Sequence, residues 1–347
     1  MLVASVIVDI ATRALDRPFN YLVPSQLVPS AQVGCAVSVD FGNRPVVGYI
    51  IELAEMDEER CAALVGDTSK LKPLLGVLSE PYFDTVSASL ATWIAHEYLC
   101  TLPEALHLFT PPGGSPKVKR VEGEWQLVFP GVGPVDDRWA VLTEEASDFV
   151  PAKNAAKQQR VLEALSCGGM RVVELSALLG NVNATLKSLE KRGVVRIENR
   201  RHMRGAMPAV HGACCAADQL TQGQEHALAA IHATAAGETA SNVVVLDGIT
   251  GSGKTEVYLR AIDETLQAGK SAIVLVPEIA LTPQTVGRFR ARFSDDVAVL
   301  HSRLSAGERF DQWDLIRQGR AHVVVGTRSA LFAPVADLGL VIIDEEQ

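Results

Sequence analysis

Residues 217–347 alternate regularly between short apolar runs and amphipathic stretches, and this alternation constrains the fold more than any other feature. The apolar runs are NVVVLD (242–247), SAIVLVP (271–277), VAVLH (297–301), AHVVVG (321–326) and LGLVIID (338–344). Runs that are apolar throughout and separated by helices are typical of a parallel sheet that is covered on both faces. The sequence therefore predicts an α/β lobe, which we place at 206–347.

The rest of the chain divides into three further regions, so a multidomain protein is expected. Residues 1–112 contain Val/Ile-rich strands such as VASVIVDI, and then a helix, SASLATWIAHEYL, whose predicted buried stripe is Leu90, Trp93, Ile94 and Tyr98. Residues 113–150 are interpreted as a connector, or as a hairpin packed on a neighbour. Residues 151–205 follow the order helix, short helix, turn, helix, strand, which indicates a winged helix.

Composition and charge narrow the function classes. The chain has 347 residues, 48% hydrophobic and 21% charged, with no secretory signal and no apolar run long enough to span a bilayer. A cytoplasmic protein that does not bind membranes is expected. Six cysteines show no C-x-x-C spacing, so neither disulfides nor zinc are expected.

Basic residues gather in one part of an otherwise acidic chain. The net charge is −9, yet residues 151–204 carry eleven lysines and arginines against four acids. A local basic patch is a candidate for binding nucleic-acid phosphates, and a solvated surface is the alternative.

The segment 248-GITGSGKT-255 fits the phosphate-loop pattern G-x-x-x-x-G-K-[ST], and it lies between an apolar run and a helical stretch. Glycines let the backbone curl so that its N–H groups point at phosphate oxygens, and the following helix directs its positive end there. Lys254 is predicted to reach the β- and γ-phosphates, and the Thr255 hydroxyl to bind Mg²⁺. The predicted nucleotide-binding residues of this loop are Gly248, Thr250, Gly251, Ser252, Gly253, Lys254 and Thr255.

A second apolar run ends in carboxylates, at 341-VIIDEEQ-347. Asp344 is predicted to hold Mg²⁺ through water opposite Thr255, and Glu345 to orient or deprotonate the attacking water. Lys254, Asp344 and Glu345 are therefore the predicted catalytic residues, with ATP and Mg²⁺ as cofactors. A solvated strand end is the alternative interpretation of the acids.

Several blocks together resemble the PriA-type DNA helicases of bacterial replication restart (primosomal protein N′), in helicase superfamily 2. The blocks are GITGSGKTEVYL (248–259), VPEIALTPQT (276–285), LHSRLS (300–305), GTRSALFAP (326–334) and VIIDEE (341–346). RPFNYLVP (17–24) and DFGNRPVVGYII (40–51) are similar to the family's N-terminal domain, so the resemblance covers the whole chain.

The resemblance implies roles for individual residues that their local sequence patterns alone do not indicate. The first RecA-like lobe would begin near LTQGQ, with Gln224 as the adenine-reading glutamine. Phe19, Asn20, Gly42 and Lys72 would hold the terminal nucleotide of a nascent 3′ end, where stacking and a cation suit the task. Asn20 stands where the family more usually has Asp. The implied partners are forked and single-stranded DNA, other primosome proteins and single-strand-binding protein.

Two departures from the family pattern affect the expected activity. Gln347 occupies the position where the family normally has His, a side chain that couples hydrolysis to motion. The chain then ends, so the predicted lobe is incomplete, and an unpaired sheet edge with exposed apolar surface is expected. A second lobe normally supplies an arginine to the γ-phosphate, which is worth on the order of 10³-fold in related NTPases. We therefore expect weak nucleotide binding and little hydrolysis by this chain.

Three functions fit these observations. The first is a 3′-to-5′ ATP-dependent helicase that recognises stalled forks and initiates primosome assembly, of which this chain is the N-terminal half. The second is a fork-DNA-binding module that does not unwind. The third is a winged-helix regulator fused to a P-loop NTPase, which would bind one duplex sequence.

Overall fold

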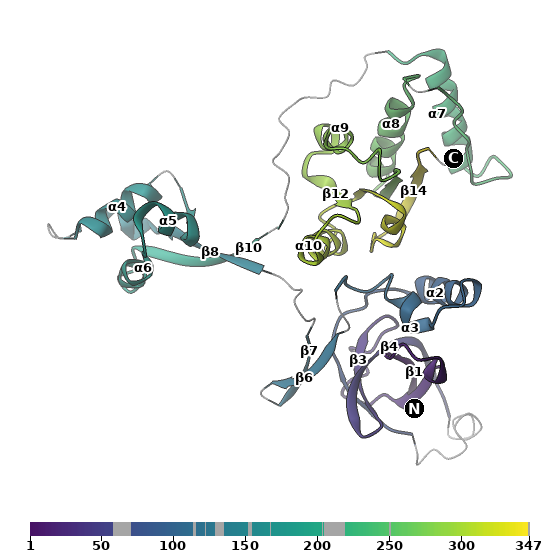
Figure 1. Ribbon diagram of the computed structural model, residues 1–347, viewed down its shortest axis with the longest axis horizontal. Coiled ribbons are helices and arrows are strands. Elements are labelled where there is room, and N and C mark those ends of the chain that lie inside the picture. The colour runs from purple at the N-terminus through teal and green to yellow at the C-terminus, as the bar shows by residue number, and fades with distance from the viewer. Residues whose placement is uncertain are drawn as a thin grey trace. The chain divides into compact units, whose positions relative to one another are not determined.

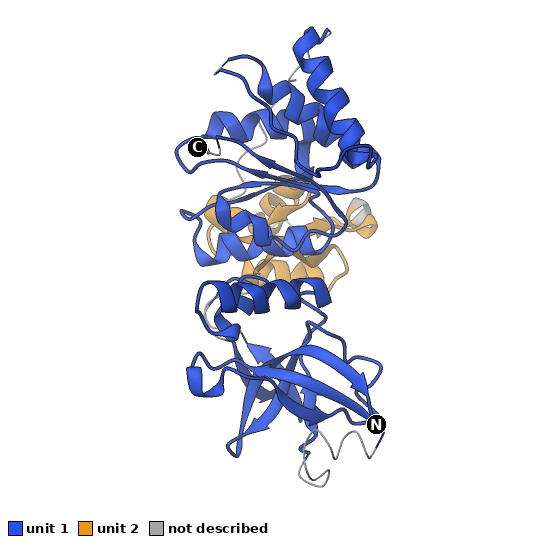
Figure 2. Cartoon of the chain, turned by 90° about the vertical axis from the view of Figure 1, so that its right-hand side faces the viewer, with its two compact units in different colours: residues 1–132, 207–347 blue, residues 133–206 orange. Residues whose placement is uncertain are grey.

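A computed structural model describes residues 1–57, 71–113, 116–121, 123–128, 135–151, 155–166, 168–202, 204, 219–249 and 251–345. The chain forms two compact units, residues 1–132 with 207–347 and residues 133–206 (Figure 2). Each unit has its own hydrophobic core. No helix of the described residues is long and apolar enough to cross a membrane.

The N-terminal part of the larger unit is a five-stranded antiparallel sheet that curls toward closure (Figure 1). The strand order is β2-β1-β4-β3-β5, and a bridge between Leu22 and Pro73 joins the two edge strands. The strands are β1 (Leu2–Val8), β2 (Phe19–Leu22), β3 (Ala36–Phe41), β4 (Arg44–Glu55) and β5 (Leu74–Val77), with a short 3-10 helix η1 (Arg13–Leu15) between β1 and β2. Closure leaves few backbone groups of the sheet without partners.

Alternation along the strands builds two cores from this sheet. In β1, Ala4, Val6 and Val8 belong to the core on one face, and Ile7 belongs to the core on the other. The second face is covered by two helices, α2 (Thr85–Glu97) and α3 (Leu102–Leu106). This period of two is what a strand covered on both sides requires.

Helix α2 lies where the sequence predicts a helix, but the predicted buried stripe is wrong except at Ile94. The side of α2 that packs on the sheet is lined by Ala88, Ala91 and Ile94. Trp93 is 54% exposed, and Leu90 and Tyr98 also face solvent. Small side chains at helical spacing bring the helix backbone close to the sheet, so the larger residues turn outward.

The region interpreted as a connector is divided between the two units. Strands β6 (Lys117–Val121) and β7 (Glu124–Val128) form an antiparallel hairpin in the larger unit. Strand β8 (Val135–Leu142) belongs to the smaller unit, where it pairs with strand β10 (Val195–His202) and with strand β9 (Met170–Arg171). The connector region thus supplies the central strand of the smaller unit's sheet.

The smaller unit packs three helices on this three-stranded sheet. They are α4 (Ala156–Leu165), α5 (Val172–Leu179) and α6 (Asn183–Glu190), after a 3-10 helix η3 (Glu144–Asp148). Leu165, Leu175, Leu186 and Leu189 are almost fully buried together with Ala140 of β8. Each buried leucine stabilises the unit by about 1.5–3 kcal/mol relative to exposure.

The C-terminal part of the larger unit contains a parallel sheet in the order β12-β13-β11-β14. The strands are β11 (Ser271–Leu275), β12 (Val297–Leu300), β13 (Val323–Gly326) and β14 (Leu338–Ile343). The helices are α7 (Gln222–Ala235), α8 (Lys254–Gln267), α9 (Pro283–Phe293) and α10 (Ala306–Arg317), with short η4 (Ser294–Asp296) and η5 (Arg328–Phe332). Four of the five strands predicted from the alternation of the sequence are thus present in the structure.

Both faces of the parallel sheet are buried. Ala272 and Val274 of β11 lie in the core with α8 and α9, whereas Ile273 lies in the opposite core with Ile316 of α10. Strand β14 is at one edge, and its Val341 and Ile343 are 40% and 58% exposed.

The strand predicted at residues 242–247 is wrong in this structure. The segment has no strand conformation and forms no ladder with β14. Leu246 packs against α7, α8 and Leu340, but Val243 and Val245 are 72% and 85% exposed. An apolar run of this kind is buried as a strand only when other elements pack on both of its faces, and here they pack on one side of residues 242–247.

Candidate nucleotide and DNA sites

The glycine loop enters helix α8 through backbone conformations that favour glycine. Gly251 and Gly253 have φ of 83° and 88°, and Gly253 caps the helix that begins at Lys254. A Cβ atom at Gly253 would lie 2.5 Å from Nε2 of Gln224. The start of α8 is therefore presented beside a glycine turn, an arrangement that suits an anion.

The ammonium of Lys254 folds back onto its own loop. Lys254 Nζ donates to the carbonyl oxygen of Gly248, and it lies 3.4 Å from the carbonyl oxygen of Ile249. These oxygens hold the cation where incoming phosphate oxygens would replace them. Thr250, a predicted member of the loop, lies outside the described residues.

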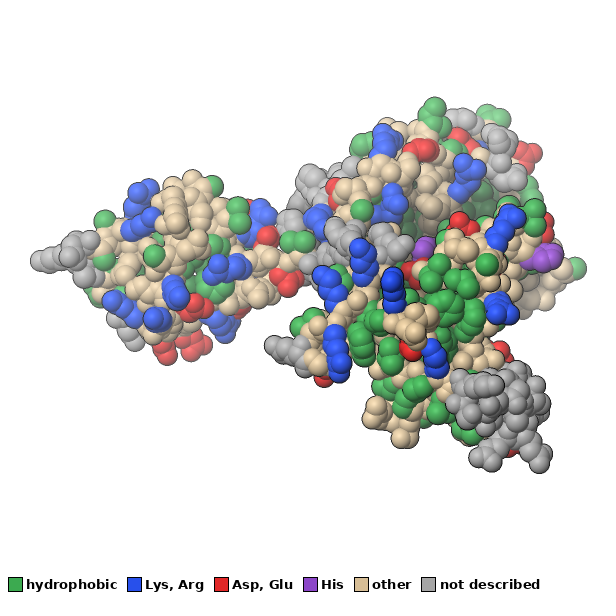
Figure 3. Space-filling view, turned by 60° about the horizontal axis from the view of Figure 1, so that its bottom comes forward, with side chains coloured by type: hydrophobic (Ala, Val, Ile, Leu, Met, Phe, Trp, Pro, Cys, Tyr) green, Lys and Arg blue, Asp and Glu red, His purple; other side chains and the backbone are tan. Residues whose placement is uncertain are grey.

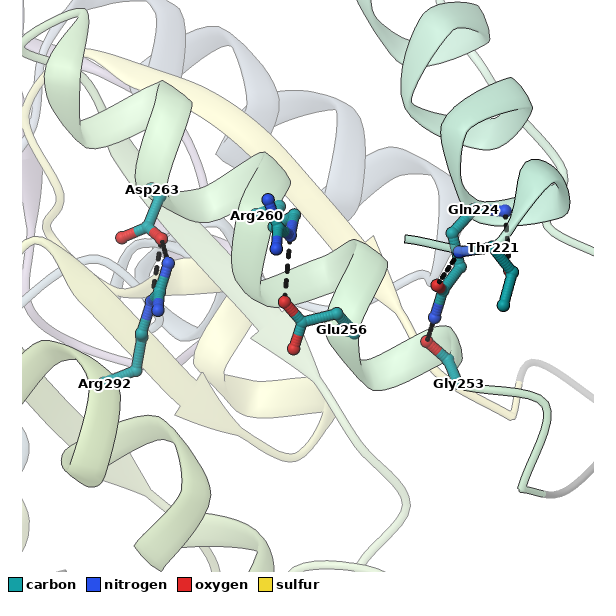
Figure 4. Close-up of polar contacts among 7 residues, drawn as sticks. All are labelled: Thr221, Gln224, Gly253, Glu256, Arg260, Asp263 and Arg292. Carbon is teal, nitrogen blue, oxygen red and sulfur yellow. Dashed lines mark hydrogen bonds and ion pairs between the residues drawn. The ribbon is translucent and has the colours of Figure 1, made fainter. Parts of the chain in front are cut away.

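Gln224 lies against the loop and has both ends of its amide engaged (Figure 4). Its Oε1 accepts from the N–H of Thr221 at 2.9 Å, which closes a capping box at the start of α7. Its Nε2 donates to the carbonyl oxygen of Gly253 at 3.2 Å. The predicted adenine-reading residue is thus in direct contact with the phosphate loop.

Asp344 is fixed at the end of β14 by two hydrogen bonds. Its N–H donates to the carbonyl oxygen of Leu275 at the end of β11, at 2.9 Å. Its Oδ1 accepts from the hydroxyl of Tyr258 at 3.1 Å. Because Tyr258 lies about one helical turn after Lys254, the carboxylate lies beside the start of α8. The acid, ninety residues after Lys254 in sequence, therefore contacts the helix that follows the loop.

Glu345 follows with a left-handed backbone, φ 51°, which is uncommon for a residue other than glycine. Such conformations gather at functional sites, where the surrounding structure maintains them. The Glu345 side chain is exposed at the sheet edge. Gln347 lies outside the described residues.

Tyr258 is a site residue that the sequence analysis missed. Burial, and then the charge of Asp344, raises the pKa of the Tyr258 hydroxyl to about 12, so it is a neutral donor at physiological pH. The available signal was its spacing of four residues from Lys254, which places the two side chains on one face of a helix.

Two ion pairs involve α8 behind the loop (Figure 4). Arg260 donates to Glu256 at 2.9 Å along the helix, and Arg292 of α9 donates to Asp263 at 2.8 Å. The second pair joins α8 to α9, so the helix that carries Lys254 and Tyr258 is braced from its far end.

The oxygen donors beside the loop fit a magnesium ion. Mg²⁺ prefers carboxylate, hydroxyl and water oxygens. Asp344 supplies the carboxylate, and Thr255 supplies a hydroxyl in the first turn of α8. The residues present therefore match the metal predicted from the sequence.

The structure brings three of the four predicted DNA-pocket residues, Phe19, Gly42 and Lys72, to one region of the N-terminal sheet. The Phe19 ring packs edge-on against Phe41, with 5.0 Å between ring centroids, and Gly42 follows Phe41 directly. Lys72 Nζ lies 3.0 Å from Oδ2 of Asp40, the residue before Phe41. Gly42 thus links the aromatic pair to the turn, and the Lys72 cation lies next to it.

Two details of this region come from the structure rather than from the sequence. Gly42 and Asn43 both have positive φ, 59° and 62°, which makes a tight two-residue turn between β3 and β4. Asn20 accepts a hydrogen bond from the Ser5 hydroxyl at 3.1 Å, so its amide oxygen is already engaged.

Lysine and arginine side chains are scattered over the visible face of the smaller unit (Figure 3). Part of this charge is neutralised within the unit, because Arg196 and Arg200 each donate to Glu198 at 2.9 Å. Lys187 and Lys191, at the end of α6, are exposed. Lys153 lies outside the described residues.

Comparisons with known proteins match two separate regions of the chain. Residues 5–111 match the family described as the 3′ DNA-binding domain of PriA, and residues 221–347 match the DEAD/DEAH box helicase family. The chain is 32% identical to the replication restart protein PriA of Bacillus subtilis, over 99% of the chain and 48% of that relative. It is 33% identical to PriA of Haemophilus influenzae, over 96% of the chain and 43% of that relative.

The chain belongs to the PriA family. It spans less than half the length of these curated relatives. A shorter stretch, 29% of the chain, is 49% identical to PriA of Helicobacter pylori. The PriA-type resemblance read from the phosphate loop and the acidic strand end is therefore confirmed.

Proposed function

We propose that this chain provides the fork-binding and ATP-binding parts of a PriA-type helicase that restarts replication. The observation that carries the proposal is the hydrogen bond from Tyr258 to Asp344, which joins the helix of the phosphate loop to the acidic strand end. The same chain matches a 3′ DNA-binding domain. A nucleotide site and a DNA-end site on one chain are what such an enzyme needs.

The proposed chemistry assigns each group of the nucleotide site one task. Lys254 leaves the Gly248 carbonyl and binds the β- and γ-phosphates, where a charge-assisted contact is strong. Thr255 and Asp344 hold Mg²⁺, which neutralises phosphate charge when bound. Glu345 orients the attacking water, and Gln224 contacts adenine while it supports the loop.

The proposed DNA contacts lie in two places. Phe19, Asn20, Gly42 and Lys72 would hold the terminal nucleotide of a 3′ end, by stacking and by phosphate pairing. The smaller unit would act as a winged helix at 151–205 that contacts duplex phosphates with its basic residues. Fork recognition, 3′-to-5′ movement and assembly with primosome proteins are proposed on the family resemblance.

Binding measurements on the 347-residue chain test the proposal. Fluorescence anisotropy should show tighter binding to a fork with a free 3′-hydroxyl than to one with a 3′-phosphate, and affinity should fall steeply with salt. Replacing Lys187 and Lys191 by Glu should weaken fork binding and reduce its salt dependence. Equal affinity for both 3′ ends would leave the DNA-end site without support.

A strand-separation assay, together with the binding measurements, distinguishes the helicase from the two other functions, a fork-binding module and a winged-helix regulator. A fork-binding module that does not unwind would show the 3′-end preference with no ATP-driven separation. A winged-helix regulator would prefer one duplex sequence and ignore 3′ ends. ATP-dependent separation that Lys254→Ala abolishes would favour the helicase.

A further inference from the structure

We infer that Tyr258 is a positioning residue that sets the orientation of the Asp344 carboxylate toward the metal of the nucleotide. The inference rests on the proposed nucleotide site and adds to it a residue that touches neither phosphate nor metal. Its basis is the hydrogen bond of 3.1 Å from the Tyr258 hydroxyl to Oδ1 of Asp344.

The Asp344 carboxylate needs such a partner because β14 lies at the edge of the sheet. Asp344 comes directly after the last residue of β14, and only its backbone N–H is tied to the neighbouring strand, through Leu275. The next residue, Glu345, has a left-handed backbone that turns the chain away from the strand direction. The backbone therefore places Asp344 without deciding how its carboxylate is rotated.

Tyr258 supplies a rigid reference for that rotation. Its ring packs against the core formed by α8, α9 and the sheet, so the position of the hydroxyl is set by the same helix that carries Lys254 and Thr255. When Oδ1 accepts from Tyr258, Oδ2 is the oxygen that remains for a metal-bound water. The metal-facing oxygen and the phosphate loop are thus positioned by one helix.

The chemical type of the donor matters. A neutral hydroxyl donates to the carboxylate and leaves its negative charge in place, whereas a lysine or arginine there would compete with the metal for that charge. Hydrogen-bond partners of metal-binding groups typically contribute a factor of 10 to 100 in metal affinity. Removing the Tyr258 hydroxyl should therefore weaken Mg²⁺ binding and leave the contacts to the nucleotide itself intact.

Tyr258→Phe removes only the hydroxyl. Tyr98→Phe is the control, because it makes the same change at an exposed tyrosine at the end of α2. Binding of a fluorescent ADP analogue would be measured across a Mg²⁺ titration, with Asp344→Asn as the reference for loss of the carboxylate. We expect Tyr258→Phe to raise the Mg²⁺ concentration at half-effect about tenfold. ADP binding in EDTA and the melting temperature should match those of wild type and of Tyr98→Phe.

The outcomes separate the inference from the proposed function. If wild type binds the analogue with a Mg²⁺ dependence that Tyr258→Phe does not change, the positioning role is overturned and the nucleotide site stands. If Tyr258→Phe weakens binding equally in EDTA, or lowers the melting temperature as much, the tyrosine serves packing and the inference is also overturned. If wild type shows no Mg²⁺-dependent binding, the proposed nucleotide site itself fails.

Discussion

The side-chain amide of Gln224 donates to the carbonyl oxygen of Gly253 at 3.2 Å, across the boundary between α7 and the phosphate loop. The same side chain accepts from Thr221 and closes the cap of α7. One residue therefore joins the start of the lobe to the turn that presents Lys254. This double engagement allows the two roles of Gln224 to be tested separately.

Gln224→Glu should lower ADP affinity without loosening α7. A glutamate still accepts from the Thr221 N–H, as in the usual capping box, but it cannot donate to the Gly253 carbonyl. Gln224→Ala loses both side-chain bonds while the Thr221 hydroxyl still accepts from the N–H of residue 224, so the helix should lose about 0.5–1.5 kcal/mol, the contribution of one hydrogen bond. Titrations with ADP and GDP, together with thermal melting, check both variants.

The nucleotide preference decides which task Gln224 performs. If Gln224 reads adenine, its replacement should weaken ADP binding more than GDP binding. Equal losses for the two nucleotides would mean that Gln224 supports the loop only.

Lys254→Ala should weaken nucleotide binding strongly and leave the fold unchanged. Among the described residues, the hydrogen bonds of the ammonium go to carbonyls of its own loop, so its loss should remove no link between these elements. A charge-assisted hydrogen bond contributes about 1.5–3 kcal/mol, which corresponds to roughly 10- to 100-fold in affinity. Isothermal titration calorimetry with ADP and Mg²⁺ measures the effect, and Lys270→Ala, at an exposed position after α8, is the control.

Lys72→Ala should weaken binding of single-stranded DNA at its 3′ end without affecting stability. The Lys72–Asp40 pair is partly exposed, so it contributes about 0–1 kcal/mol to folding. Loss of one phosphate contact should lower the slope of log affinity against log salt by about one. Lys117→Ala, at an exposed position of β6, should not change the slope. Wild-type affinity and slope in Lys72→Ala would remove Lys72 from the proposed pocket.

The His107–Asp9 pair should make the N-terminal domain more stable at acidic pH. Nε2 of His107 lies 2.6 Å from Oδ1 of Asp9, whose side chain is only 4% exposed. That hydrogen bond raises the pKa of His107 above its usual value near 6.5. Because the folded pKa is the higher one, the stabilisation is fully present below about pH 6.5 and is lost as pH rises through the folded pKa.

Hydrogen exchange along β1 (Leu2–Val8) measures this dependence. His107→Ala should speed exchange most at acidic pH, because the extra stability that follows from the raised pKa of His107 is present only there. His96→Ala, at an exposed position of α2, should have no such effect. The same loss of protection at pH 5.5 and at pH 9 would contradict the assignment.

The sequence predicted the parallel lobe well because its strands are apolar on both faces and its helices have clear beginnings. Thr282 and Ser305 cap α9 and α10, and each side chain accepts from a backbone N–H of the first turn. Local signals of this kind depend on neighbouring residues and can be read without the tertiary fold.

The features that the sequence did not predict depend on contacts between distant segments. The buried side of α2 is the one on which Ala88 and Ala91 let the helix approach the sheet closely. A prediction that buries the largest apolar side chains selects the opposite side. The segment 242–247 has the pattern of a strand, but pairing also requires a partner edge and cover on both faces. The bond between Tyr258 and Asp344 spans eighty-six residues, so the local spacing of Tyr258 from Lys254 could not identify its partner.

A crystal structure of the chain with ADP and Mg²⁺ tests the central claim most directly. The account predicts that the β-phosphate lies within hydrogen-bond reach of Lys254 Nζ, and that the metal lies between the Thr255 hydroxyl and the Asp344 carboxylate. A nucleotide bound elsewhere, or a metal bound without either oxygen, would contradict it.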